Sequence, residues 1–102
     1  MYIYIIQSKE TGQFKIGKTK NIKRRLKQLQ TGSSGELVII DEFKTNYPNK
    51  LEKYLHNIFK HENTIGEWFT LCYSEVGKFK RECEKMEKNY EFLENNKKSI
   101  DY

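Results

Sequence analysis

The fold is decided by residues 2–19, which read YIYIIQSKETGQFKIGKT. Residues 2–7 are mostly β-branched or aromatic, and this composition favours a β-strand. Residues 8–13 are polar and include Gly12, which accepts the positive φ of a tight turn. Because residues 14–18 favour a second strand, the stretch predicts a β-hairpin.

The pairing of the two strands follows from side-chain alternation. If Ser8 pairs with Gln13 across the turn, Tyr4 lies opposite Gly17, and Lys15 lies diagonally from Tyr4 on the same face. The glycine then leaves room above the sheet. The opposite face is the expected core.

The remaining chain predicts helices and extended segments at alternating positions. In chain order they are a helix over 21–31, a strand within 36–45, a helix from Pro48 to about 61, an extended segment over 67–71, and a long helix capped by Ser74. We therefore expect an α+β fold, with a small three-stranded antiparallel sheet flanked by helices and a long C-terminal helix.

We expect one domain over residues 1–95 and a frayed tail over 96–102. Eight apolar side chains should be buried: Ile3, Ile5, Phe14, Ile16, Ile22, Leu26, Leu51 and Leu55.

Charge and cysteine content narrow the possible functions. The chain of 102 residues carries 19 basic and 14 acidic side chains, and its net charge of +5 mildly favours an anionic partner. Cys72 and Cys83 alone form neither a disulfide framework nor a zinc site. No apolar stretch is long enough for a membrane span, and no signal peptide is apparent. We expect a protein of the cytoplasm, nucleoid or nucleus that is not secreted and not bound to a membrane.

The helix over 21–31 is strongly basic. Arg25 sits at the edge of its apolar stripe, one position before Leu26, and from there it can reach the sheet. The surrounding cations suit a phosphate backbone and are the expected DNA-binding residues: Lys18, Lys20, Lys23, Arg24 and Lys27.

The next helix carries Glu52 and, one turn later, His56, at the edge of the stripe formed by Leu51 and Leu55. A lone carboxylate can hold Mg²⁺ together with water and a substrate phosphate. An acidic residue near a histidine is also common on a solvated helix face, so both interpretations stay open.

Taken together, these motifs resemble the GIY-YIG nuclease superfamily. Tyr2-Ile3-Tyr4 matches its first motif, Lys15-Ile16-Gly17 its second, and Arg25 and Glu52 follow in the expected order. The second motif reads KIG, and a Glu-x-x-x-His helix precedes Gly66-Glu67-Trp68-Phe69. These details are similar to the phage open-reading-frame and meiotically up-regulated gene branch of the superfamily.

The resemblance implies the three-stranded antiparallel sheet flanked by helices described above, and hydrolysis of DNA with one divalent metal, Mg²⁺ or Mn²⁺. It implies that Tyr4 is the general base, Arg25 stabilises charge on the phosphate, and Glu52 holds the metal. It also places Lys15 and His56 in the catalytic site, and Gly17 in the structural motif. Two positions depart from the superfamily pattern, because Tyr2 replaces a glycine and Lys15 replaces a tyrosine.

The free phenol has a pKa near ~10, so Tyr4 needs activation before it can act as a base. We expect the ammonium of Lys15 to lower the Tyr4 pKa. Trp68 and Phe69 either join the core or stack on nucleobases.

Three functions are compatible with the sequence. A metal-dependent DNA endonuclease is favoured by the set of retained motif residues. A catalytically inactive nucleic-acid-binding module is favoured by the lack of a histidine that many superfamily members carry near the first helix. A protein-interaction module using the long C-terminal helix is the third.

Overall fold

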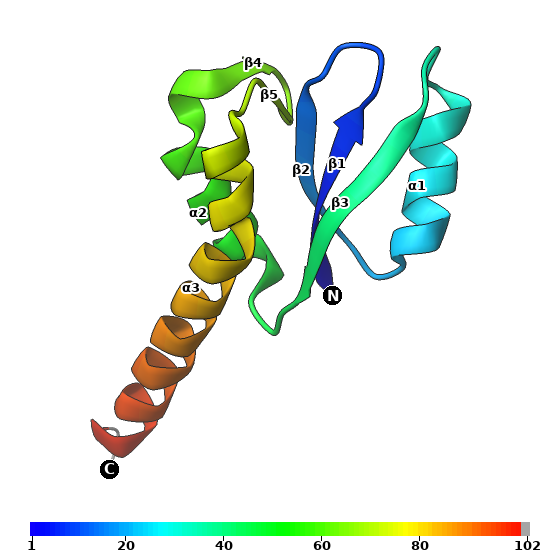
Figure 1. Ribbon diagram of the computed structural model, residues 1–102. Helices are drawn as coiled ribbons and strands as arrows, with labels where there is room; N and C mark the ends of the chain where they lie inside the picture. The colour runs from blue at the N-terminus through cyan, green and yellow to red at the C-terminus, as the bar shows by residue number, and fades with distance from the viewer. Residues whose placement is uncertain (101–102) are drawn as a thin grey trace.

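A computed structural model describes the backbone of residues 1–100 and the side chains of residues 1–96. Its centre is one antiparallel sheet with the strand order β3-β1-β2-β5-β4 (Figure 1). The strands are β1 (Tyr2–Ser8), β2 (Phe14–Thr19), β3 (Leu37–Lys44), β4 (Asn63–Ile65) and β5 (Trp68–Phe69). The α+β prediction is confirmed, with five strands in place of the expected three.

The β1–β2 pairing has the register that the turn predicts. Tyr4 lies opposite Gly17 and Ile6 opposite Lys15, so Tyr4, Gly17 and Lys15 share one face. The Ser8 backbone N–H donates to the Gln13 carbonyl at 2.9 Å, and Gly12 has a φ of 76° in the turn. A slip by one residue would turn every side chain of one strand to the opposite face, and Gly17 and Lys15 would no longer share a face with Tyr4.

Helices cover both faces of the sheet (Figure 1). Helix α1 (Ile22–Thr31) lies on one face, whereas α2 (Pro48–Ile58) and α3 (Tyr73–Ile100) lie on the other. A short 3₁₀ turn, η1 (Lys60–Glu62), connects α2 to the β4–β5 hairpin. This layering gives the two faces separate cores.

The larger core lies under α2 and α3. It contains Ile3, Ile5, Phe14, Ile16, Leu51, Leu55, Phe59, Phe69, Leu71, Phe79 and Cys83. The smaller core lies under α1 and contains Tyr4, Ile6, Ile22 and Leu37. Of the eight side chains predicted to be buried, all are buried except Leu26, which is half-buried.

Several element boundaries differ from the prediction. Asn21 caps α1, because its side-chain oxygen accepts the backbone N–H of Arg24 at 3.0 Å. The predicted cap at Ser74 is wrong, since α3 begins at Tyr73 and the Glu75 carboxylate accepts the Cys72 N–H at 3.0 Å. Strand β4 was not predicted, because Asn63–Ile65 is exposed throughout and shows no alternation.

Both cysteines are free, with Cys72 exposed and Cys83 buried. None of the helices in the described part of the chain combines the length and the apolar character that a bilayer crossing requires. The predicted frayed tail over 96–102 falls largely on residues outside those that the structure describes.

Candidate active site

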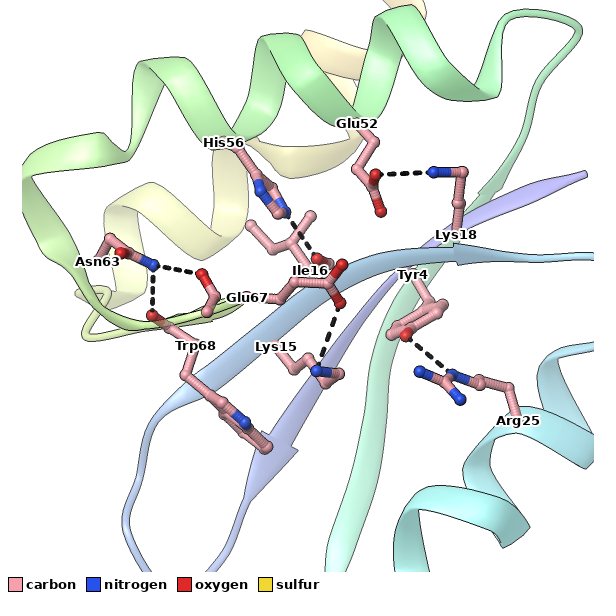
Figure 2. Close-up of polar contacts among 11 residues, drawn as sticks. Tyr4, Lys15, Ile16, Lys18, Arg25, Glu52, His56, Asn63, Glu67 and Trp68 are labelled. Carbon is pink, nitrogen blue, oxygen red and sulfur yellow. Dashed lines mark hydrogen bonds and ion pairs between the residues drawn. The ribbon is translucent and has the colours of Figure 1, made fainter.

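The candidate site lies at the edge of β2, where that strand passes beyond β5. On β2, only Phe14 and Lys15 pair with β5. The part of β2 that follows them has no partner strand on this side within the described chain, and side chains of α2 lie next to it. His56 Nε2 lies 2.8 Å from the Ile16 carbonyl oxygen, to which it donates a hydrogen bond. Figure 2 shows Glu52 and His56 approaching β2 from α2, while Tyr4 and Arg25 approach from the side of α1.

Tyr4 is held tightly on the α1 side of the sheet. Its side chain is 1% exposed and crosses the space above Gly17, whose missing side chain makes room for the phenol. A Cβ on Gly17 would lie 2.4 Å from the Tyr4 hydroxyl, which is far too close. The space that Gly17 leaves above the sheet is therefore occupied by the Tyr4 phenol.

Arg25 reaches the sheet from α1, as its position at the edge of the apolar stripe predicts. Its Nε donates to the Tyr4 hydroxyl oxygen at 3.4 Å (Figure 2). This hydrogen bond raises the pKa of Arg25 further above its usual value. The guanidinium therefore brings a permanent positive charge next to the phenol.

The predicted effect of Lys15 on Tyr4 is wrong. Burial raises the pKa of the Tyr4 phenol, and the negative charges of Glu67 and Glu52 raise it further. The hydrogen bond and the charge of Arg25 act in the opposite direction, without reversing the shift. At neutral pH and without an added cation, Tyr4 is protonated.

Lys15 is occupied by other partners. Its Nζ lies 3.3 Å from Glu67 Oε1 and 5.4 Å from the centre of the Trp68 ring. The Glu67 carboxylate neutralises the ammonium, and this pairing explains why the charge of Lys15 is not available to the phenol.

Two acidic side chains and one histidine converge at the β2 edge. Among the described residues, Glu52, His56 and Glu67 each offer a ligand atom, and these atoms all lie within 4.8 Å of one another. The Glu52 carboxylate currently pairs with Lys18, at 3.0 Å. The Glu67 carboxylate pairs with Lys15 in the same way. Both carboxylates therefore bind a cation, and a metal ion would compete with the two lysines for them.

The donor types fit a divalent ion. Carboxylate oxygens suit Mg²⁺ and Mn²⁺, and an imidazole nitrogen is a common ligand of transition metals. The hydrogen bond from His56 Nε2 to the Ile16 carbonyl orients the imidazole. The three side chains therefore offer a donor set that suits a divalent ion.

Glu67 was not predicted as a site residue, although it lies within the Gly66-Glu67-Trp68-Phe69 segment. The tight β4–β5 hairpin places it beside β2, with Gly66 at a φ of 57°. Asn63 Nδ2 fixes this hairpin by donating to the carbonyls of Gly66 and Trp68, at 2.8 and 3.0 Å. The sequence did contain a signal for the turn, because Gly66 can adopt a positive φ. No local pattern, however, indicated which residues Glu67 would contact.

The two aromatic residues of β5 have different environments. Phe69 is buried, and its ring meets His56 edge-on with 5.1 Å between ring centres. This contact and the hydrogen bond to Ile16 fix the imidazole orientation. Trp68 is only half-buried, packs against the smaller core and lies on the side of β2 that carries Tyr4 (Figure 2).

The cations predicted to contact DNA lie along β2 and α1. Lys20, Lys23, Arg24 and Lys27 are exposed, and none of them makes an ion pair within the described part of the chain. Lys18 differs, because Glu52 occupies its ammonium. These four cations are therefore exposed and available to an anionic partner.

Comparison with known proteins gives one family. The model of the T5orf172 domain matches residues 1–84, which include both carboxylates, His56, Tyr4 and Arg25. No curated protein and no solved structure matches the chain significantly. The division into a domain over 1–95 and a tail stays a prediction.

Proposed function

Because the chain belongs to the T5orf172 domain family, which is nuclease-like and related to nucleic acids, we propose that it is a small metal-dependent DNA endonuclease. The observation that carries this proposal is the convergence of Glu52, His56 and Glu67 within 4.8 Å of one another, beside the Tyr4–Arg25 pair. Such a site combines ligands for a divalent ion with a proton acceptor and a fixed cation.

The proposed substrate is a phosphodiester bond of DNA lying across the β2 edge. The unpaired cations of α1 hold the flanking phosphates, while Arg25 faces the phosphate that reacts. Arg25 is half-buried and already held by Tyr4, so little reorganisation is needed when negative charge develops on the phosphate oxygens.

Glu52, Glu67 and His56 would hold Mg²⁺ or Mn²⁺. When bound, the ion supplies Lewis-acid polarisation of the phosphate and stabilises the leaving oxygen. Lys18 and Lys15 would then lose their carboxylate partners and become available to phosphate.

Tyr4 is the proposed base that takes the proton of the attacking water. Its hydroxyl oxygen already accepts a hydrogen bond from Arg25, and the same donor would stabilise the phenolate. The two acidic charges that raise the Tyr4 pKa are those of the proposed metal ligands. A metal ion would neutralise these two carboxylates and so remove their contribution to the raised pKa of Tyr4. The ability of Tyr4 to accept a proton would therefore depend on whether the metal site is occupied.

A second candidate is a nucleic-acid-binding module without catalysis on the same fold. The observation that favours it is the raised pKa of Tyr4, together with the two lysines that neutralise Glu52 and Glu67. A site in this state binds phosphate through Arg25 and the α1 cations but lacks a base.

Nicking of a supercoiled plasmid separates the two candidates. Wild type should nick it with Mg²⁺ or Mn²⁺ and not with EDTA, and Glu52→Gln should abolish nicking while leaving DNA binding nearly intact. Glu84→Gln is the matched control, because Glu84 is an exposed carboxylate on α3, and it should behave as wild type.

Calorimetric titration of Mn²⁺ provides a readout independent of cleavage. Glu52→Gln and Glu67→Gln should each weaken Mn²⁺ binding, and Glu84→Gln should not. A wild-type protein that binds the plasmid but leaves it supercoiled under both metals would replace the first candidate with the second.

A further inference from the structure

A hollow of about 540 Å³ lies next to the candidate site, on the face of the sheet that carries Tyr4. The turn between β1 and β2 forms one wall, and the end of α1 with its following loop forms another. The third wall is the β4–β5 hairpin, through Ile65 and Trp68. Its volume is within the range of sites that take small molecules.

The hairpin wall presents flat and apolar surface. Ile65 and Trp68 are cross-strand partners, so their side chains are neighbours. Ile65 is 76% exposed and Trp68 is half-buried, although both border the hollow. Leu29 of α1 contributes further apolar surface. A planar aromatic ligand would cover surface that otherwise faces water.

The opposite end of the hollow is polar. Glu10 accepts hydrogen bonds from the Ser34 hydroxyl at 3.2 and 3.1 Å, and the exposed Gln28 lies nearby. A carboxylate repels phosphate but accepts hydrogen bonds from the amino groups of nucleobases. This end is therefore suited to a base edge rather than to the sugar–phosphate backbone.

Lys15 connects the hollow to the candidate site. Its ammonium pairs with Glu67 at 3.3 Å and lies 5.4 Å from the centre of the Trp68 ring. A phosphate held at the β2 edge and a base held on Trp68 would thus be near neighbours. In a paired duplex, a base is stacked within the helix and cannot enter such a hollow.

We infer that the hollow receives one unpaired nucleobase adjacent to the scissile phosphate, stacked on Trp68. This inference rests on the proposed nuclease function and narrows its substrate class to DNA with an unpaired nucleotide at the cleavage point. Stacking on an aromatic side chain typically strengthens binding by about 5–150-fold per base.

The single tryptophan of the chain makes the inference directly measurable. Three duplexes of one sequence are titrated into wild-type protein with EDTA present: one fully paired, one with a single-nucleotide bulge, and one with an abasic residue at the bulge. The bulged duplex should quench tryptophan fluorescence and bind at least about 5-fold more tightly than the other two. Equal affinity for all three without quenching would overturn the inference and leave the proposed nuclease standing.

A variant tests the stacking surface itself. Trp68→Leu keeps an apolar side chain against the smaller core, and it should lose the preference for the bulged duplex while keeping affinity for the paired one, as measured by anisotropy of labelled DNA. Phe92→Leu, which changes an exposed aromatic residue of α3, is the matched control and should keep the preference.

Other outcomes are equally decisive. Retention of the bulge preference in Trp68→Leu would overturn the inference. Absence of binding to any of the three duplexes would remove both the inference and the proposed function. Quenching by the bulged duplex in a protein that cleaves nothing with Mg²⁺ or Mn²⁺ would support the base site and reject the nuclease.

Discussion

Replacing Gly17 with alanine should disrupt the Tyr4 site without removing any polar side chain. The added Cβ would lie 2.4 Å from the Tyr4 hydroxyl oxygen, 2.7 Å from Tyr4 Cζ and 3.2 Å from Glu67 Oε1. Gly12 and Gly66 have positive φ in the described chain, whereas Gly17 does not. The cost of the substitution therefore comes from the contact with Tyr4 and not from the backbone.

The size of the effect follows from how firmly Tyr4 is held. Its side chain is 1% exposed and packs in the smaller core, so the ring can tilt away from the new Cβ only by displacing its neighbours. Overpacking of this kind typically costs about 1–3 kcal/mol of unfolding free energy. Each kcal/mol should lower the melting temperature of a domain of this size by about 4–8 °C. The tilted phenol should also lose its hydrogen bond from Arg25.

Urea denaturation followed by circular dichroism measures the stability change, and plasmid nicking measures the activity. Gly77→Ala is the matched control, because nothing lies within 4 Å of a Cβ at this helical position. That substitution should stabilise the protein by up to about 1 kcal/mol through helix propensity. A Gly17→Ala protein as stable as wild type would refute the claim that Gly17 exists to make room for Tyr4.

A double substitution isolates the contact. Tyr4→Phe removes the oxygen atom at 2.4 Å but keeps the ring carbon at 2.7 Å, so it should relieve the clash only in part. The two substitutions should therefore be less costly together than the sum of their separate effects. Additive costs would show that the residues do not act through this contact.

Three further predictions address binding, reactivity and the core. Replacing both Lys23 and Lys27 by alanine should weaken DNA binding similarly for all DNA sequences. It should also reduce the slope of log affinity against log salt concentration by about 2, as measured by fluorescence anisotropy at several salt concentrations. An unchanged slope would exclude both lysines from phosphate contact. Burial raises the pKa of Cys83 to about 12, so a thiol reagent at pH 8 should modify exposed Cys72 rapidly and Cys83 only after unfolding; two fast thiols would contradict this. Leu55→Ala should lower the unfolding free energy by about 2–5 kcal/mol in urea denaturation, and a cost below 1 kcal/mol would argue against its place in the core.

The sequence determined the elements whose signals are local. Strand alternation fixed which side chains share a face, because only a slip by an odd number of residues would change it, and the turn around Gly12 selected the β1–β2 register. The same register placed Tyr4 opposite Gly17. Helical periodicity placed Arg25 and Glu52 at the edges of buried stripes, from which Arg25 reaches Tyr4 and Glu52 reaches His56 and Glu67.

Tertiary structure decided which charges meet. Lys15 was expected to act on Tyr4 from the same face of the sheet, but Glu67 arrives from the β4–β5 hairpin and pairs with it. Strand β4 carries exposed residues and no periodic pattern, so the sequence predicted an extended segment at 67–71 but not the strand that pairs with it in a hairpin. The third potential metal ligand therefore remained hidden.

The protonation state of Tyr4 was also beyond the sequence. Its pKa depends on burial under α1, on the distance to Arg25 and on the carboxylates of Glu52 and Glu67. The periodicity of a strand or helix depends on residues close together in the chain, so it can be recognised in the sequence. Desolvation and charge–charge energies depend on distances between segments that only folding brings together, and for this reason the local fold was predictable while the electrostatics of the site was not.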